Sequence, residues 1–366
     1  MAVLAVSGGG TGGHFFPALT VMEKAKEETA FREIFFLGDR RGIEYRLKET
    51  LSKVATPVFL QLEKFKGVSL ARKLKFLTSL GKNIYQIHKV LEGKNFISLH
   101  FGGYTGVPLG LYSVLRKKPL FLHEQNSIPG ATNRYLAKVA KRVFITFPQS
   151  EKFFPKHKVV LTGMPLRKEV KKAKNLSKEQ IYKKLGIEKE LFTLLIMGGS
   201  QGAKAINKLA VELSLLLKKE DIQIIHLTGP RNYEETLSMY KAAKVDLSRV
   251  KVIPFYLNMG EIYRIADFAI SRSGAATSFE LAYFGIPTLF IPFPYAIYNH
   301  QYHNAKYFVQ EGGAYLMEEK FLNLNKVLLI LKNHLKDKSL HQQKREAMLK
   351  SFIPDAEEKI LKNLFL

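Results

Sequence analysis

Three glycine-rich turns carry the clearest chemical signal in this chain of 366 residues. They are Gly8 to His14 (GGGTGGH), Gly102 to Gly106 (GGYTG) and Gly198 to Gly202 (GGSQG), and each follows a short apolar run. Glycine lets the backbone approach a ligand closely, and a helix that follows such a turn offers free N–H groups to an anion. One such turn could serve packing alone, but three indicate a site for more than one phosphate-bearing group.

Two polar motifs also follow apolar runs. The run His123-Glu124-Gln125-Asn126 ends one of them, and Ser271 to Glu280 (SRSGAATSFE) leads from another into a helical stretch. Polar side chains at the carboxyl ends of strands line the binding crevice of open α/β sheets, although Asn and Thr also cap helices. Glu280 could accept two hydroxyl hydrogen bonds from a ribose, or it could complement the dipole of its helix.

The elements that must position these motifs alternate along the chain. Short apolar runs are followed by loops and helical stretches, first between Val3 and Leu161 and again between Phe192 and Ile291. A helix is predicted from about Pro17 to Glu28 after the first turn, and strands are predicted at Phe192 to Met197, Ile222 to Leu227 and Phe268 to Ser271. This alternation predicts an α/β chain with two Rossmann-like parallel-sheet domains in tandem. We place the first domain at residues 1–163, completed by a C-terminal helix over 352–366, and the second at 164–351.

The charge of the chain calls for an anionic partner. Its 57 Lys and Arg against 32 Asp and Glu give a formal net charge of +25, and residues 1–163 alone carry 26 basic and 11 acidic side chains. Residues 64–94 hold eight basic residues and a single acid, Glu92. Nucleic acid, an anionic membrane surface and a phosphate-bearing substrate are the candidate partners. Because basic and aromatic residues do not interleave as in RNA-binding motifs, we expect that the chain does not bind nucleic acid.

Composition excludes several other classes of protein. With 46% hydrophobic and 24% charged residues the chain is not intrinsically disordered. It contains no Cys, so a disulfide framework, a zinc–thiolate site and a thiol nucleophile are all excluded. No run of 18 apolar residues occurs, and the first residues lack a basic leader and apolar stretch, so we expect neither a membrane-spanning helix nor a secretory signal.

Taken together and in order, the motifs resemble those of the MurG family. They are GGGTGGH, HEQN, GGSQGA at 198–203, RSGAATSFE at 272–280, GIPTLFIPFP at 285–294 and NHQYHNA at 299–305. That family is an inverting glycosyltransferase that moves N-acetylglucosamine (GlcNAc) from UDP-GlcNAc to the C4 hydroxyl of N-acetylmuramic acid (MurNAc) in lipid I. The product is lipid II, the precursor of peptidoglycan. The resemblance implies a GT-B fold, with the two Rossmann-like domains facing across a cleft.

The resemblance also implies roles for residues at matching positions. Arg167 and Ser200 would contact the donor diphosphate, and Glu280 would hold the ribose. The other donor-site positions are Ala275, Ala276, Thr277, Ser278 and Phe279 in the RSGAATSFE run, the Tyr256 backbone at the uracil, Gln301 at the GlcNAc hydroxyls, and Thr11, Gly12, Gly13 and Asn126 from the first domain. Gly102, Gly103 and Tyr104 would form a loop on the acceptor side.

Transfer needs a base for the acceptor hydroxyl and a way to stabilise the leaving diphosphate. His14 is our first candidate for the base because imidazole titrates near neutral pH, and Glu124 is the second. His14 could instead only stabilise its loop. The sequence has no Asp-x-Asp pair and no cluster with metal-ligand spacing, so we expect neither a protein-bound metal nor a cofactor. Helix N-termini and Arg167 would stabilise the leaving group.

The acceptor of that family is held in a membrane. Phe65 to Leu80 interleaves apolar and basic residues, which suits peripheral attachment to anionic lipid on the cytoplasmic face of the cell membrane, although a helix packed on the core would show the same pattern. The family role also implies proteins of cell-wall synthesis or division as partners.

The alternative function is an NAD(P)-dependent Rossmann oxidoreductase, which would use the first glycine turn and Asp39 as a dinucleotide site.

Overall fold

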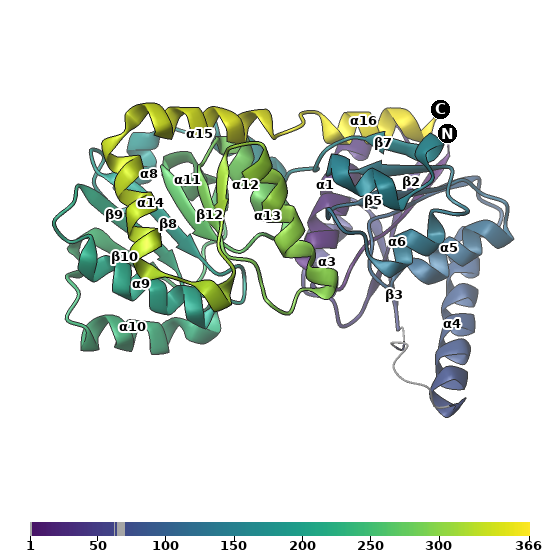
Figure 1. Ribbon diagram of the computed structural model, residues 1–366. Helices are drawn as coiled ribbons and strands as arrows, with labels where there is room; N and C mark the ends of the chain where they lie inside the picture. The colour runs from purple at the N-terminus through teal and green to yellow at the C-terminus, as the bar shows by residue number, and fades with distance from the viewer. Residues whose placement is uncertain (1, 62, 64–69) are drawn as a thin grey trace. The chain divides into compact units, whose positions relative to one another are not determined.

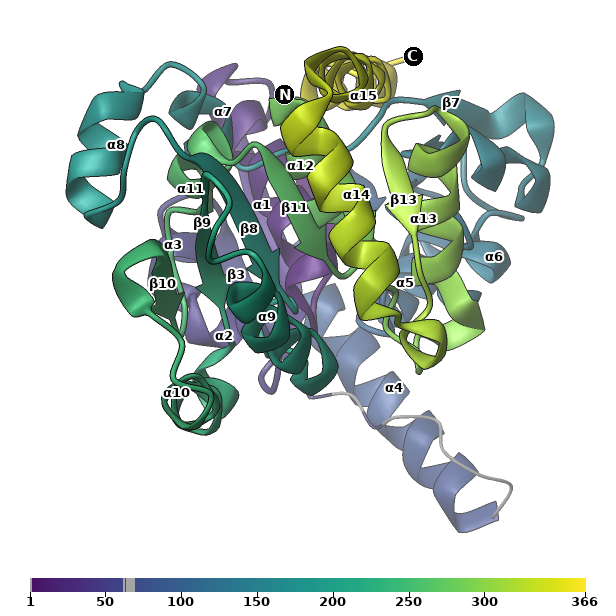
Figure 2. The same cartoon turned by 60° about the vertical axis from the view of Figure 1, so that its left-hand side comes forward.

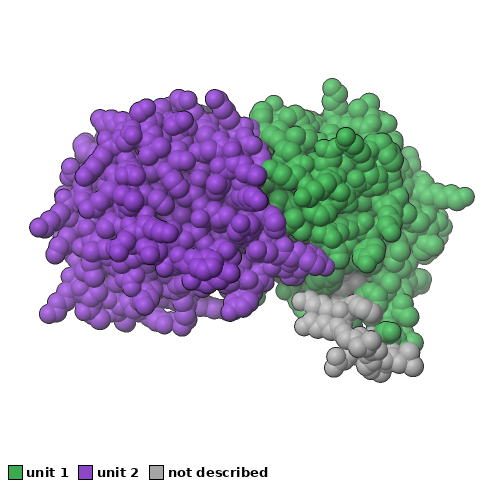
Figure 3. All heavy atoms as spheres, viewed as in Figure 1, with its two compact units in different colours: residues 1–167, 353–366 green, residues 168–352 purple. Residues whose placement is uncertain are grey.

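A computed structural model describes residues 2–61, 63 and 70–366 of the chain (Figure 1). The chain divides into two compact units, which Figure 3 colours separately. The first is Met1–Arg167 together with Ile353–Leu366, and the second is Lys168–Phe352. The division therefore falls after Arg167, whereas the sequence places the boundary at residue 163.

Seven parallel strands form the sheet of the first unit, in the order β3-β2-β1-β4-β5-β6-β7. The strands are β1 (Val3–Ser7), β2 (Glu33–Asp39), β3 (Thr56–Leu60), β4 (Phe96–His100), β5 (Leu120–Glu124), β6 (Arg142–Ile145) and β7 (Val159–Leu161). The helices are α1 (Gly12–Glu27), α2 (Ile43–Arg46), α3 (Lys48–Ser52), α4 (Leu70–Leu91), α5 (Gly106–Leu115), α6 (Ala131–Leu136) and α16 (Ala356–Leu364). Because helices cover both faces, β1 is buried throughout and its residues Val3 to Val6 form a continuous apolar run.

The last helix of the chain belongs to the first unit. Ile360, Leu361 and Leu364 of α16 join the core that α1 forms with β1, and Figure 1 shows α16 beside α1 at the chain ends. Gly163 lies against Ile353, where the chain returns from the second unit. The C-terminal helix that the sequence assigns to this unit thus contributes directly to its hydrophobic core.

Six parallel strands form the sheet of the second unit, in the order β10-β9-β8-β11-β12-β13. They are β8 (Phe192–Met197), β9 (Ile222–Leu227), β10 (Val250–Ile253), β11 (Phe268–Ser271), β12 (Thr288–Phe290) and β13 (Ala314–Leu316). The helices are α7 (Lys168–Ala173), α8 (Lys178–Leu185), α9 (Lys204–Leu216), α10 (Tyr233–Ala242), α11 (Met259–Ile265), α12 (Ala275–Phe284), α13 (His300–Gln310), α14 (Leu324–Lys336) and α15 (Lys338–Lys350). One face of the sheet is covered by α9 and α14 (Figure 2), whose apolar residues pack on β8 and β11.

Both sheets reverse their strand order at one place, and the sequence motifs lie there. In the first unit the reversal falls between β1 and β4, and in the second between β8 and β11. Each of these four strands is followed by a glycine-containing turn and then by α1, α5, α9 or α12. Ligands of open α/β sheets bind at the carboxyl ends of strands beside such a reversal. The fold therefore places all four turns where a ligand site is expected.

Candidate active site

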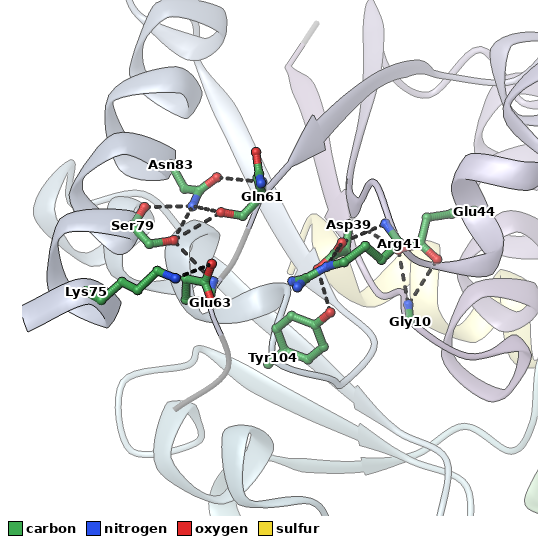
Figure 4. A network of polar contacts seen from close by, with 10 residues as sticks. All are labelled: Gly10, Asp39, Arg41, Glu44, Gln61, Glu63, Lys75, Ser79, Asn83 and Tyr104. Carbon is green, nitrogen blue, oxygen red and sulfur yellow. Dashed lines mark hydrogen bonds and ion pairs between the residues drawn. The ribbon is translucent and has the colours of Figure 1, made fainter. Parts of the chain in front are cut away.

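The first glycine turn rests on a carboxylate. Glu44 of α2 is buried, and its oxygens accept hydrogen bonds from the backbone N–H of Gly10, at 3.1 and 3.0 Å, and of Asp39, at 2.8 Å (Figure 4). A Cβ at Gly9 would lie 2.0 Å from Glu44 Oε1, and one at Gly42 would lie 2.1 Å from Oε2. The glycines thus make room for a side chain that ties the turn to the end of β2. The sequence motifs do not single out Glu44, because it lies outside them.

Replacing Glu44 by Ala should loosen this turn. Two backbone N–H groups would lose their acceptor in a buried place, which costs roughly 1–3 kcal/mol for a group left without a partner. We expect the free energy of unfolding to fall by about 2 kcal/mol in denaturant titrations. Glu49→Ala, on the neighbouring helix and exposed, is the matched control. Equal stability of the two variants would contradict a supporting role for Glu44.

A chain of hydrogen bonds fixes the proton on His14. Gly163 O can only accept, so His123 Nε2 donates to it at 3.2 Å. The His123 Nδ1 atom then accepts from Gln125 Nε2 at 3.0 Å, and Gln125 Oε1 accepts from His14 Nδ1 at 2.9 Å. Burial lowers the pKa of His123 to about 4, which keeps this ring neutral. His14 Nδ1 therefore carries the proton, and Nε2 of a neutral His14 keeps a lone pair that can act as a base.

The second glycine turn packs against the same histidine. Gly102 and Gly103 have φ of 96° and 83°, and a Cβ at Gly102 would lie 3.0 Å from the His14 ring. Glycine is needed at both positions, since positive φ and this close approach each exclude a side chain. The structure thus brings His14, Gly102, Gly103 and Gln125 together, whereas the sequence only places each motif after an apolar run.

Tyr104 points away from this group, toward Asp39. Its hydroxyl donates to Asp39 Oδ2, and Arg41 donates to both carboxylate oxygens (Figure 4). Burial alone would raise the pKa of Asp39, but the hydrogen bonds from Arg41 and Tyr104 lower it overall. Burial and, after it, the hydrogen bond to Asp39 raise the pKa of Tyr104 to about 12, against the opposing charge of Arg41. A dinucleotide site would need the Asp39 carboxylate to accept hydrogen bonds from the ribose hydroxyls. Both of its oxygens already accept hydrogen bonds from Arg41 and Tyr104.

Glu124 anchors the loop that carries Asn126. Its Oε1 accepts from the Asn126 backbone at 2.9 Å, and its Oε2 accepts from Gly130 N at 3.3 Å and Asn133 Nδ2 at 2.8 Å. Burial raises the pKa of the Glu124 carboxyl, and these hydrogen bonds partly offset that effect. A carboxylate that is this well occupied suits loop anchoring better than proton transfer, so His14 is the stronger candidate for the base.

Arg167 lies at the end of the first unit, beside the first glycine turn. Its guanidinium carbon is 5.2 Å from the centre of the Phe16 ring in α1. A Cβ at Gly12 would lie 3.1 Å from the same ring. Phe16 therefore links Arg167 to the start of α1, where exposed Thr11 precedes Gly12 and Gly13.

In the second unit, Ser200 is exposed in the turn between β8 and α9. Gly199 and Gly202 have φ of 86° and 75°, and a Cβ at Gly202 would lie 1.9 Å from Thr228 O. These glycines let the turn fold back closely over the end of β9. The neighbouring turn after β11 leads into α12, whose first residues are Ala275, Ala276 and Thr277.

The side chains of α12 divide between the turn and the core. Glu280 is 5% exposed, and its Oε2 accepts from Tyr263 OH at 3.0 Å. Ser278 donates to Gly274 O within the helix, and Phe279 packs edge-on against Phe308. We therefore keep Ala275 to Thr277 and Glu280 as proposed ligand contacts and assign the side chains of Ser278 and Phe279 to packing.

Two further donor-site candidates have partners inside the second unit. The Tyr256 hydroxyl donates to Glu261 Oε2, and Lys184 Nζ lies 5.9 Å from the centre of its ring, so the side chain has partners and the family motif assigns the uracil contact to its backbone. Gln301 Oε1 accepts from the Phe293 backbone at 3.0 Å, and its carbonyl accepts from Ser273 Oγ at 2.8 Å. These bonds fix Gln301 at the end of β12, beside the turn that starts α12.

Comparison with known proteins identifies the family. The model of the glycosyltransferase family 28 N-terminal domain matches residues 4–145, and that of its C-terminal domain matches residues 193–360. This chain belongs to glycosyltransferase family 28. It is 42% identical, over 99% of both chains, to a protein of Aquifex aeolicus named UDP-N-acetylglucosamine--N-acetylmuramyl-(pentapeptide) pyrophosphoryl-undecaprenol N-acetylglucosamine transferase. A protein of the same name from a Sulfurihydrogenibium species is 38% identical over 98% of this chain and 96% of its own length.

Solved structures agree on the fold of this family 28 chain. The crystal structure of Acinetobacter baumannii MurG matches 100% of the chain and 99% of its own, at 27% identity and a TM-score of 0.76. A UDP-GlcNAc 2-epimerase from Neisseria meningitidis, at 16% identity and a TM-score of 0.72, shares the fold alone. The chain thus has the GT-B fold, with two Rossmann-like units of seven and six strands. None of these similarities supports the oxidoreductase alternative.

The helices that follow the four turns share one feature in this family 28 chain. The starts of α1, α5, α9 and α12 have neither a side-chain cap nor an acid in the first turn. Of the other helices, α6 and α13 share this feature, whereas Ser177, Asn323 and Asp337 cap α8, α14 and α15. An uncapped helix start leaves backbone N–H groups for an anion. Among the residues described, no group of three His, Asp or Glu side chains could hold a metal ion.

Proposed function

We propose that this chain transfers GlcNAc from UDP-GlcNAc to the C4 hydroxyl of MurNAc in lipid I and so forms lipid II. The observation that carries the proposal is the 42% identity, over 99% of both chains, to a transferase named for this reaction. The geometry supports it, because four uncapped helix starts lie at the two strand-order reversals. A diphosphate donor and a diphosphate-linked acceptor each need such anion-binding groups.

In this proposal the second unit holds the donor. Glu280 accepts hydrogen bonds from the ribose hydroxyls, while the start of α12 and Ser200 bind the diphosphate. Gln301 binds the GlcNAc hydroxyls through its amide NH₂ group, and the Tyr256 backbone contacts the uracil. Arg167 adds a positive charge for the diphosphate. These roles rest on the family motifs and on where the structure places each residue.

In this proposal the first unit binds the acceptor and supplies the base. His14 Nε2 takes the proton from the acceptor hydroxyl as that oxygen bonds to the anomeric carbon of GlcNAc. The bond to the diphosphate oxygen breaks on the opposite side, so UDP leaves with the electron pair and the configuration inverts. Helix N–H groups and Arg167 stabilise the charge that develops on UDP. Thr11, Gly12, Gly13 and Asn126 complete the sugar site, next to the loop of Gly102 to Tyr104.

The test is a transfer assay with UDP-GlcNAc labelled in the sugar and lipid I in detergent. We expect label in a lipid-linked disaccharide, and thermal stabilisation of the protein by UDP but not by NAD. Failure to transfer under conditions in which a MurG from another organism is active would overturn the proposal. Stabilisation by NAD alone would favour the oxidoreductase.

Transfer should proceed without a protein-bound metal. Anion binding by helix N-termini and Arg167 can replace the divalent ion that other nucleotide-sugar enzymes hold. We expect full activity in excess EDTA, measured with the same assay after the protein has been dialysed against chelator. Complete loss of activity that only a divalent ion restores would contradict this prediction.

We further propose that the enzyme attaches peripherally to the cytoplasmic face of the cell membrane, where its lipid-linked acceptor lies. The predicted docking segment is Phe65 to Leu80, of which residues 65–69 lie outside the described residues. In the described part, Leu74 and Leu77 are 62% and 59% exposed. Figures 1 and 2 show this end of α4 extending beyond the sheet that its other end covers. Exposed apolar side chains beside Lys73 and Lys75 suit an anionic lipid surface. No helix among the described residues is long and apolar enough to cross a membrane.

Replacing Leu74 and Leu77 by Ser should weaken this attachment. Both side chains would enter the lipid interface, where burial of a leucine contributes about 1.5–3 kcal/mol. We expect at least a tenfold loss of affinity for phosphatidylglycerol vesicles in a sedimentation assay (about 1.4 kcal/mol). Leu215 and Leu216, exposed on α9, provide the matched double Ser control. Equal vesicle binding by the two double variants would refute the docking role.

Proteins of cell-wall synthesis or division remain predicted partners.

A further inference from the structure

A cavity of about 380 Å³ lies in the first unit at the carboxyl ends of β2 and β3, against α4. Arg40 lines it from the end of β2, Gln61 and Glu63 from the chain after β3, and Lys75 and Lys82 from α4. Figure 4 shows this region beside the contacts of Asp39, Arg41 and Tyr104. Of the lining residues, Lys75, Thr78 and Ser79 belong to the proposed docking segment, whereas no role proposed so far uses Arg40, Gln61 or Lys82.

The wall between α4 and β3 is firmly built. Because β3 is at the edge of the sheet, the backbone along its outer side needs other partners. Asn83 Oδ1 accepts from Gln61 N at 3.1 Å and its Nδ2 donates to Gln61 O at 3.0 Å, while Ser79 Oγ accepts from Glu63 N at 3.2 Å (Figure 4). Gln86 donates to Phe59 O at 3.4 Å. Side chains on one face of α4 thus hold the backbone of the strand end by hydrogen bonds. The wall of the cavity between α4 and β3 is fixed by these contacts.

The cavity has an excess of positive charge. Lys75 pairs with Glu63 at 3.6 Å, which leaves Arg40 and Lys82. Among the described residues, neither of these two makes an ion pair. Gln61 and Thr78 add an amide and a hydroxyl to the lining. Two unpaired cations beside uncharged hydrogen-bonding groups suit a ligand that carries both carboxylate and amide groups.

We propose that this cavity binds the peptide of the acceptor, with Arg40 and Lys82 on its carboxylate. The assignment rests on the proposed function, in which the acceptor is a muramyl pentapeptide. A peptide joined to the sugar through its amino end keeps a free carboxylate at its other end. Strands lie about 4.8 Å apart, so β3 is about 10 Å from β1 and its glycine turn. Five extended residues span up to about 17 Å. A peptide on a sugar held near His14 therefore reaches the cavity.

A lipid headgroup is the competing occupant, and the position of the cavity argues against it. At about 100° per residue, the α4 residues that line the cavity are centred roughly 140° around the helix from Leu74 and Leu77, and Thr78, about 40° from Leu74, is the nearest of them. The exposed leucines and the cavity therefore lie on different faces of the helix. The cavity shares its edge of the sheet with the first glycine turn instead.

The experiment compares two acceptors, lipid I and lipid I with the peptide carboxyl groups converted to carboxamides. The variant is Arg40→Gln with Lys82→Gln, and the control is Lys89→Gln, an exposed charge on the same helix that neither lines the cavity nor belongs to the docking segment. We expect the double variant to lower kcat/KM for lipid I by roughly tenfold, because two partly exposed charge pairs are lost. For the carboxamide acceptor the same variant should match the wild type, and KM for UDP-GlcNAc should not change.

Other results would overturn the assignment. An equal loss on both acceptors would show that the two cations act on structure or on the diphosphate. Unchanged kcat/KM with weaker binding to phosphatidylglycerol vesicles would assign the cavity to a lipid headgroup. The proposed function would fail differently, since the wild-type chain would then transfer GlcNAc to neither acceptor.

Discussion

Replacing His14 by Ala is expected to lower kcat by about 10²–10⁴, the usual contribution of a general base. The Nε2 lone pair of this residue is available because Nδ1 donates to Gln125, whose own orientation is fixed through His123 and Gly163. Since UDP-GlcNAc binds through the second unit in our proposal, its KM should change little. Steady-state kinetics with saturating lipid I would measure both quantities.

Two comparisons make the result specific to proton transfer. His157→Ala removes an exposed histidine of the same unit and should keep full activity. Gln125→Leu keeps His14 but releases its Nδ1, so we expect a smaller loss of about tenfold and a shifted pH profile of kcat. A loss below tenfold for His14→Ala, or an unchanged pH profile, would leave His14 with only a loop-stabilising role.

Replacing Glu280 by Ala is expected to raise KM for UDP-GlcNAc by about 10²-fold while kcat changes much less. In our proposal the carboxylate accepts two hydrogen bonds from the ribose, and each bond to a charged group contributes about 1.5–3 kcal/mol. The loss applies to ground state and transition state alike, because the ribose is remote from the reacting carbon. Calorimetric titration with UDP should show the same loss of affinity.

Tyr263→Phe separates ligand binding from helix packing. This change removes the hydroxyl that donates to Glu280 Oε2 but keeps the carboxylate and the ring. We expect it to weaken UDP binding only about threefold, since one positioning hydrogen bond of roughly 0.5–1.5 kcal/mol is lost. If Glu280→Ala bound UDP as tightly as Tyr263→Phe, the carboxylate would serve only to hold Tyr263 against α12, since Glu280 lies beyond the first turn of that helix.

The sequence predicts the strands that carry the motifs better than the elements between them. Phe192 to Met197, Ile222 to Leu227 and Phe268 to Ser271 match β8, β9 and β11, because a strand buried on both faces is a continuous apolar run. The edge strand β3 (Thr56–Leu60) was not predicted, since it includes Pro57 and is only partly buried. The helix predicted from Pro17 in fact begins at Gly12, because glycines of the turn already adopt helical geometry.

Site residues that lie within a sequence motif could be predicted. Residues that contact those motifs from distant parts of the chain could not. The HEQN run marks Gln125, but its bond to His14 joins residues 111 positions apart. Glu44 has no motif around it, and its role follows from how α2 returns beneath the first turn. The cavity beside α4 depends on contacts between two separate elements. Tertiary proximity of this kind leaves no periodic signal in a single sequence.

The discontinuous first unit has a consequence for how the chain is made. Residues 1–167 are translated before the second unit, but Ile360, Leu361 and Leu364 of their core are translated after it. Domains fold as units during synthesis, generally from the N-terminal end. Here the second unit is complete in sequence while the apolar surface of α1 still awaits α16. The first unit therefore completes its core only after the second unit has been translated. On a ribosome stalled before α16, the apolar surface of α1 in the unit that contains His14 would stay exposed, and chaperones could bind it.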